Sequence, residues 1–267
     1  MIRKIKREEL SLVRDFAPPD WNVNLEKLFG QHYDQYYFYA LIVLSGAELS
    51  GTGMAVVHGN CAWIGTIIVR EEYRLRGIGK QITQHLIDHS QQRGIGTILL
   101  SASHAGAPMY AKMGFAVDSH YVFLKPGSPE PVVAAAVEYI SPIIPKDHDA
   151  IIALDRSLSG EERGGLLLNS FSNGYKYADG SIRGYYLPDL GKGLVIADTD
   201  QAGIELLKFK VSRERSMVCI PEANAVAMEF LVSIGYKPYL TATRMYLGKN
   251  IVWQPGKVYA RGSGALG

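Results

Sequence analysis

The sequence predicts an α/β protein built from two domains in tandem. Apolar runs of strand length alternate with amphipathic stretches of helix length along the chain. A proline-rich stretch, Lys125–Val133, interrupts both periodicities, and a similar order of elements follows it. Two domains of about 130 residues would be ordinary in size for a chain of 267 residues. We therefore expect one domain at residues 1–125, a linker at 126–134 and a second domain at 135–267.

The composition indicates a cytoplasmic globular protein. Hydrophobic residues make up 47% and charged residues 20%, which allows cores of normal size, and the net charge of +2 argues against nucleic acid or an anionic membrane as a partner. No apolar run reaches the length of a membrane span, and the first residues contain no apolar signal-peptide core. Cys61 and Cys219 are too few for a disulfide framework, and the histidines lack ligand spacing. We expect reduced thiols and no metal.

The first half alternates strands and helices in an order that the apolar pattern indicates. Gly114 follows the second helical stretch, where a C-terminal glycine is typical. The expected elements are a strand at Trp63–Val69, a helix at Ile78–Gln92, a strand at Thr97–Ala102, a helix from about Ala105 to Met113 and a strand from Phe115.

The segment between the first of these strands and its helix reads Arg-Leu-Arg-Gly-Ile-Gly. Gly77 and Gly79 lack a Cβ atom, so the backbone can turn sharply and bring successive N–H groups close to an anion at the helix start. Arg74, Arg76 and Lys80 add positive charge at the same place. This combination predicts a pyrophosphate site.

Two other phosphate-binding loops do not fit. A Walker A loop needs a glycine at position 74, where the chain has arginine. A dinucleotide-binding fingerprint needs a small residue at position 82, where Ile82 stands. The remaining alternative is a solvated basic turn.

The order strand, Arg-x-x-Gly-x-Gly, helix resembles the acetyl-coenzyme A motif of the GNAT superfamily of N-acetyltransferases. The string Met109–Phe115, with Tyr110 shortly before a Gly-Phe pair, looks like the second motif of that family. The resemblance implies a mixed, largely antiparallel sheet with a splayed central strand pair, and acetyl-CoA as cofactor. The cofactor-binding residues that it implies are Ile68, Val69, Arg74, Leu75, Arg76, Gly77, Ile78, Gly79 and Lys80.

The resemblance also implies a mechanism. Backbone groups near Ile68 and Val69 would pair with the pantetheine amides, and an N–H there would stabilise the oxyanion. Tyr110 would protonate the departing thiolate; the alternative is an ordinary half-buried tyrosine. The base that accepts the amine proton stays open between Glu48, Asp34, His58 and a water chain. Only the position that the implied fold would give these three side chains near the site makes them candidates.

The second half repeats the order of elements but not the chemistry. Where the first half has its basic loop, the second has Asp198–Gly203, with one glycine and two carboxylates that oppose a pyrophosphate and suit an empty helix start. The place of Tyr110 falls on Leu231, which cannot donate a proton. The expected elements are a strand at Glu138–Ile143, helices from about His148 and from Ser159, strands at 184–187 and 194–197, a helix from Gln201, a strand at Met217–Ile220 and a helix ending at Gly235. We expect a divergent, non-catalytic GNAT-like domain.

The acceptor is the part that the sequence specifies least. By the resemblance, helices within Arg7–Gln31 would line its pocket. The aromatic residues Tyr33 and Tyr36–Tyr39 either form an acceptor wall or alternate between core and surface. A small-molecule amine is favoured, because no acidic run for a peptide is present. Two functions remain open: an acetyl-CoA-dependent N-acetyltransferase, and a non-catalytic acyl-CoA-binding module that acts through a partner. A homodimer is possible in either case.

Overall fold

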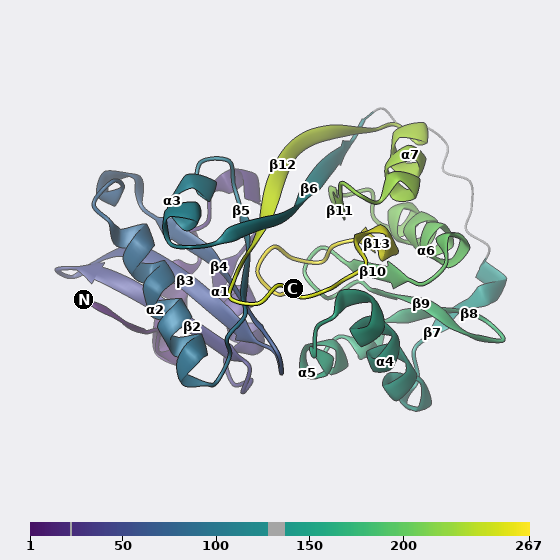
Figure 1. The fold of residues 1–267 in the computed structure, drawn as a ribbon, viewed down its shortest axis with the longest axis horizontal. Helices are drawn as coiled ribbons and strands as arrows, with labels where there is room; N and C mark the ends of the chain where they lie inside the picture. Colours follow the sequence, from purple (N-terminus) through teal and green to yellow (C-terminus); the bar gives the residue numbers. More distant parts are fainter. Residues whose placement is uncertain (22, 128–136) are drawn as a thin grey trace. The chain divides into compact units, whose positions relative to one another are not determined.

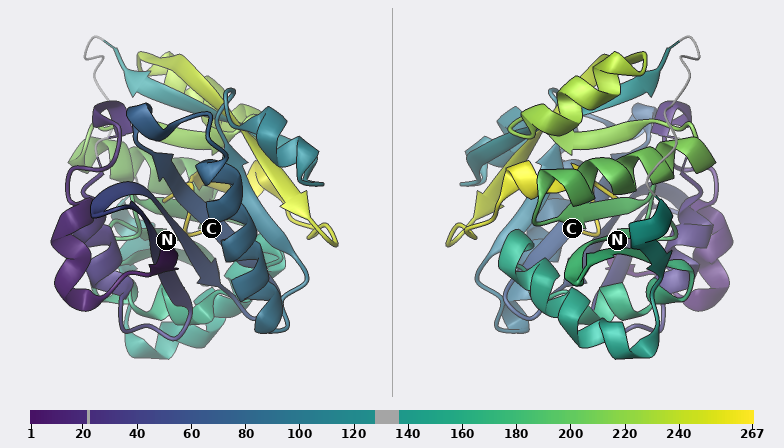
Figure 2. Two further views of the ribbon diagram at one scale, coloured as in Figure 1. Left: turned by 90° about the vertical axis from the view of Figure 1, so that its left-hand side faces the viewer. Right: turned by 90° about the vertical axis from the view of Figure 1, so that its right-hand side faces the viewer.

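A computed structural model describes residues 1–21, 23–127 and 137–267. The chain divides into two compact units, one of Met1–Leu100 with Ala265–Gly267 and one of Ser101–Gly264. Each unit contains strands with helices packed against them (Figures 1 and 2). The α/β class that the sequence predicts, with sheets flanked by helices, is confirmed.

The first unit is a sheet in the order β1-β2-β3-β4-β5. Neighbouring strands are antiparallel except β4 and β5, which are parallel. The strands are β1 Ile2–Lys4, β2 Phe38–Ser45, β3 Glu48–Val57, β4 Ala62–Val69 and β5 Ile98–Ala102, whose last two residues belong to the second unit. The helices are α1 Leu25–His32 and α2 Ile78–Gln92, with 3-10 turns at η1 Arg7–Val13, η2 Pro19–Trp21 and η3 Glu71–Tyr73.

The helix α2 covers one face of this sheet (Figure 1). Gly51 and Gly53 of β3 leave room for it, since a Cβ atom at Gly53 would lie 2.5 Å from Cγ2 of Ile82. The short helix α1 packs on the other face, where the rings of Phe29 and Phe38 lie 5.7 Å apart. We call these the α2 face and the α1 face.

The second unit contains strands in two sets, β12-β6-β11 and β13-β10-β9-β8-β7. Its strands are β6 Ala116–Pro126, β7 Ile140–Pro142, β8 Tyr175–Asp179, β9 Ser181–Leu187, β10 Leu194–Ala197, β11 Val218–Pro221, β12 Tyr236–Leu247 and β13 Val258–Ala260. Its helices are α3 Ala107–Lys112, α4 His148–Ser159, α5 Gly164–Leu168, α6 Asp200–Arg213 and α7 Ala225–Ser233, with 3-10 turns η4 Val137–Tyr139, η5 Pro145–Asp147, η6 Phe171–Asn173 and η7 Pro255–Lys257. Leu206, Leu207 and Leu231 anchor its core.

Most elements predicted from the sequence lie where expected, and α2 has the predicted bounds. The helix predicted to begin at Ser159 is wrong. Ser159 ends α4, because Gly160 takes a left-handed φ of 70° and closes that helix. The strands β3, β8, β12 and β13 were not among the predicted elements, and the first helical stretch of Arg7–Gln31 is a 3-10 turn.

The predicted linker at 126–134 falls largely outside the described residues. Of its first two residues, Pro126 is the last residue of β6 and pairs with Tyr236, and the N–H of Gly127 donates to the carbonyl of Gly235. The compact units divide at Leu100, earlier than residue 125, because β6 pairs along its length with β12 and β11. In the described residues, no helix is long and apolar enough to cross a membrane.

Candidate functional site

The basic loop turns tightly into α2 in the first unit. Leu75 and Gly77 both have left-handed backbone, with φ of 61° and 80°. A left-handed leucine costs about 1–2 kcal/mol, and its side chain is fully exposed here, so no burial of this leucine offsets the strain. Arg74, Arg76 and Lys80 lie exposed around the turn. The loop therefore holds a strained conformation with its cations in solvent.

No side chain of the described residues caps the N-terminus of α2. Gly77 is the N-cap, and the first helical hydrogen bond runs from the N–H of Gln81 to the carbonyl of Gly77. The N–H groups of Ile78, Gly79 and Lys80 thus precede that ladder and point out of the helix end. An uncapped, positively polarised helix end beside three cations can hold a phosphate group.

The strand β4 carries a bulge just before this loop. Gly65 pairs with Met54 and Ile68 pairs with Thr52. The two residues Thr66 and Ile67 of β4 therefore stand opposite one residue of β3, Gly53. Thr66 has a φ of 47°, a left-handed value that is rare for a β-branched residue. Bulges of this kind re-aim the strand beside functional sites.

One edge of β4 is open beyond its first two residues. The register with β5 consists of the pairs Ala62 with Ile98 and Trp63 with Leu99. This is the splayed strand pair that the resemblance implies. In the rest of β4, the carbonyl of Val69 accepts from Nε of Arg74 at 3.3 Å.

Val69 and Ile68 present their main-chain groups on opposite sides. The N–H of Arg70 donates to the carbonyl of Ser50 at 3.0 Å, and main-chain groups alternate along an antiparallel strand. Ile68 therefore bonds to β3, whereas the N–H and C=O of Val69 point toward the open edge. Of the two predicted residues, the register leaves only Val69 able to offer backbone groups to a ligand there.

Tyr110 lies in α3 of the second unit. Its side chain is 8% exposed, and its ring meets that of Phe115 edge-on at 5.9 Å. Burial raises the pKa of Tyr110 to about 12, so the phenol is neutral and can donate a hydrogen bond at neutral pH.

Residues 6–115 match the sequence model of the acetyltransferase (GNAT) family. This part of the chain belongs to the GNAT family. The sequence prediction of a GNAT domain in the first half is thereby confirmed. No curated protein matches the chain.

Solved structures share the GNAT fold over nearly the whole chain. A Pyrococcus horikoshii protein with a provisional assignment as an acetyltransferase aligns with a TM-score of 0.84 at 22% identity, over 100% of this chain and 95% of that protein. A tandem GNAT protein from the clavulanic acid biosynthesis pathway aligns with a TM-score of 0.63 at 14% identity, over 93% and 98%. A GCN5-related N-acetyltransferase of Sphaerobacter thermophilus aligns with a TM-score of 0.62 at 11% identity, over 98% and 96%. At these identities the likeness concerns the fold alone.

The helix α6 follows the segment that takes the place of the basic loop in the second half, and its N-terminus is capped by a side chain. The side chain of Thr199 accepts from the N–H of Ala202 and caps the helix. Asp200, in the first turn, accepts from the hydroxyl of Tyr259 at 2.7 Å and from Lys257 at 3.2 Å. The cap is therefore Thr199 and not one of the two carboxylates that the sequence suggested. Leu231, the predicted counterpart of Tyr110, is fully buried.

The candidate bases differ in their surroundings. Asp34 is an exposed partner of Arg7, and Glu48 accepts from the hydroxyl of Tyr73 at 2.6 Å. His58 is 4% exposed, and its Nε2 lies 3.2 Å from the carbonyl of Leu266. Because a carbonyl only accepts, Nε2 of His58 carries the proton of that bond.

The aromatic residues before and in β2 do not form one wall. Tyr37 is buried and Tyr36 is 72% exposed. Tyr39 stacks on His89 of α2 at 3.8 Å, on the α2 face. The cluster is therefore divided between core and surface.

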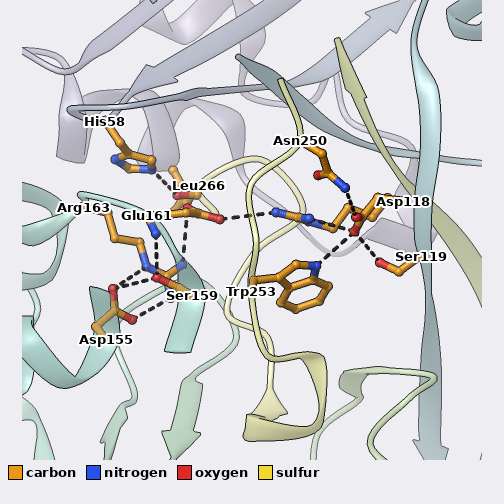
Figure 3. A network of polar contacts seen from close by, with 11 residues as sticks. His58, Asp118, Ser119, Asp155, Ser159, Glu161, Arg163, Asn250, Trp253 and Leu266 are labelled. Carbon is orange, nitrogen blue, oxygen red and sulfur yellow. Dashed lines mark hydrogen bonds and ion pairs between the residues drawn. The ribbon is translucent and has the colours of Figure 1, made fainter. Parts of the chain in front are cut away.

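Sequence reasoning missed a buried charged network in the second unit (Figure 3). Asp155 accepts from Arg163 at 3.0 and 2.8 Å, and both side chains are almost fully buried. Asp118 accepts from several donors, which are Arg244 at 2.8 Å, Asn250 at 2.8 Å, Trp253 at 3.0 Å and Ser119 at 2.9 Å. No periodic pattern marks the partners of Asp118 in the residues 244–253, because they lie more than 120 positions away from it. Gly65, by contrast, was a readable signal, because an isolated glycine in a strand indicates a bulge or a close backbone approach.

Proposed function

We propose that the chain is an N-acetyltransferase that transfers an acetyl group from acetyl-CoA to a primary amine of a small molecule by direct attack on the thioester. The observation that carries the proposal is the uncapped N-terminus of α2 beside Arg74, Arg76 and Lys80. The N-terminus of α6, by contrast, is capped by the side chain of Thr199. When bound, acetyl-CoA supplies an activated acetyl group as a thioester.

The residues of the first unit fit such a cofactor. The N–H groups at the start of α2 and the three cations would hold the pyrophosphate, with Leu75, Ile78 and Gly79 shaping the turn. The backbone of Val69 would bind amide groups at the open edge of β4, and a donor there would stabilise an oxyanion. Ile68 would contribute its side chain, since its backbone bonds to β3.

Tyr110 is our proposed donor to the leaving sulfur. Because burial raises its pKa to about 12, full proton transfer to a thiolate with an ordinary pKa of about 8.5 would be uphill by about 5 kcal/mol. The larger part of its role is therefore a hydrogen bond that stabilises the departing thiolate, and the proton that the attacking amine loses then neutralises the sulfur.

The second unit, in this proposal, is a divergent GNAT-like domain without its own catalytic site. Asp198 and Asp200 place negative charge where a pyrophosphate would need cations, and Asp200 is already engaged by Tyr259. Leu231 offers no proton. Its role would be structural or acceptor-related.

Calorimetric titration of acetyl-CoA into the full chain tests the proposal. We expect one molecule bound per chain, followed by thiol release with a panel of small primary amines. Tyr110→Phe should keep the acetyl-CoA affinity and lower kcat by about 100-fold. No binding would refute the proposal, and binding without thiol release from any amine would favour the non-catalytic module.

A further inference from the structure

The segment Ala265–Gly267, which we call the strap, belongs to the first unit although it follows the second in sequence. Ala265 is 5% exposed and Leu266 is 1% exposed. The ring Nε2 of His58 donates to the carbonyl of Leu266 at 3.2 Å (Figure 3). The strap is thus a buried part of the GNAT half.

The strap lies directly on β4 at Gly65. A Cβ atom at Gly65 would lie 2.4 Å from Cβ and 3.0 Å from Cα of Ala265. Real side chains do not approach so closely, so only glycine at this position admits the strap in its present place. The neighbouring residue, Thr66, begins the bulge of β4.

The strap occupies the α1 face. Gly65 pairs with Met54, so both point to the same side of the sheet. Met54 follows Gly53, which points at α2, and successive strand residues point to opposite faces. Val56, two residues further on, pairs with Phe38, against which α1 packs.

This placement matters for the approach of an acceptor. The helix α2 covers its own face of β3 closely, with Ile82 filling the space above Gly51 and Gly53. Because α2 closes its own face, an amine reaches the bulged part of β4 from the α1 side of the sheet or along the open edge of β4, and on the α1 side the strap lies beside Thr66.

We propose that the strap is a wall of the acceptor pocket and limits the size of the amine next to its nitrogen. The proposal rests on the proposed acetyl transfer. Both side chains of the strap are apolar and buried, so the strap limits the amine by the space that it fills beside Thr66 and not by a surface that binds it. It favours compact primary amines over those with bulky substituents near the amino group.

Gly65→Ala tests the proposal, because the new methyl group must displace the strap. The double variant with Ala265→Gly removes the closest contact and should restore the wild-type behaviour. Gly96→Ala is the control, since a Cβ atom there meets nothing within 4 Å. Hydrogen exchange of peptides that span residues 264–267 reports displacement independently of activity.

We expect Gly65→Ala to raise exchange in the strap and to leave the acetyl-CoA affinity unchanged. The ratio of kcat/KM for a bulky amine to that for a compact amine should rise about tenfold or more. Leu266→Ala, which loosens the strap without touching β4, should shift the ratio in the same direction if Gly65→Ala does not fold.

The proposal is overturned if the strap is displaced and the ratio of kcat/KM for the bulky amine to that for the compact amine stays unchanged. Weakened acetyl-CoA affinity in step with displacement also overturns it, since the strap would then support the cofactor site. Failure of the proposed function is recognised separately, because wild-type protein would then neither bind acetyl-CoA nor release thiol.

Discussion

Replacing Gly77 by aspartate is the most direct test of the phosphate site. Gly77 is the N-cap of α2, and a Cβ atom there meets nothing within 4 Å, so the change adds a charge without a clash. Gly94, just after the other end of this 15-residue helix, is a matched control. Its φ is 79° against 80° for Gly77, and it is equally open. The helix between the two sites is about 22 Å long.

The backbone strain should be the same at both positions. A left-handed non-glycine residue costs about 1–2 kcal/mol at either position, and the helix dipole adds about 0.3–1 kcal/mol in favour of the carboxylate at Gly77 and against it at Gly94. Only the first adds a negative charge beside a bound pyrophosphate. At about 6 Å and an effective dielectric constant of about 20, that repulsion is about 3 kcal/mol, or about 100-fold in Kd. Screening by physiological salt reduces it to about tenfold.

Titration of acetyl-CoA into the variants measures this difference. We expect Gly77→Asp to weaken binding between about tenfold and about 100-fold, and Gly94→Asp to bind as the wild type does. Gly77→Asn carries the same strain without the charge and separates the two effects. Equal affinity of Gly77→Asp and the wild type would show that the loop is only a turn.

Further predictions concern titration and buried charge. Because the pKa of Tyr110 is raised to about 12, the phenol stays protonated up to pH 10. Thiol release measured from pH 6 to pH 10 should therefore rise as the amine loses its proton, and a fall before pH 10 would contradict this role. Burial also raises the pKa of the Cys219 thiol to about 12, so the stability that this thiol contributes is complete below about pH 9 and is lost as the pH rises toward 12. Between pH 8.5 and pH 10, the urea midpoint should fall less in Cys219→Ala than in the wild type, and an equal fall would refute the assignment. Arg163→Met leaves Asp155 buried without its cation and should cost about 3–5 kcal/mol in urea unfolding, whereas adding Asp155→Leu should recover most of that loss. A single variant as stable as the wild type would contradict the buried pair.

The sequence predicted the parts of the first unit that depend on local patterns. The helix α2 follows from one apolar residue per turn, and its start follows from Gly77, so both lie where expected. The helix start predicted at Ser159 failed because Gly160 favours a helix end, and the next helix begins only at Gly164.

The features that sequence reasoning could not reach depend on contacts between distant residues. Thr66 adopts left-handed backbone only because the register of β4 against β3 requires an extra residue. Apart from the adjacent Ser119, the donors named for Asp118 come from more than 100 residues away, with Arg244 separated from it by 126 positions. No local pattern encodes such pairs.

The strap also constrains the order of folding. Residues 1–100 lack a buried piece of their own unit until residue 265 has been made, so a ribosome at about 5–20 residues per second must work for roughly 10–30 s in between. During that interval, Gly65 and the neighbouring face of β4 have no strap over them, and the nascent first half exposes apolar surface to chaperones or to other chains. A segment that is synthesised well after the strands of the first unit thus acts as the closing step of that unit.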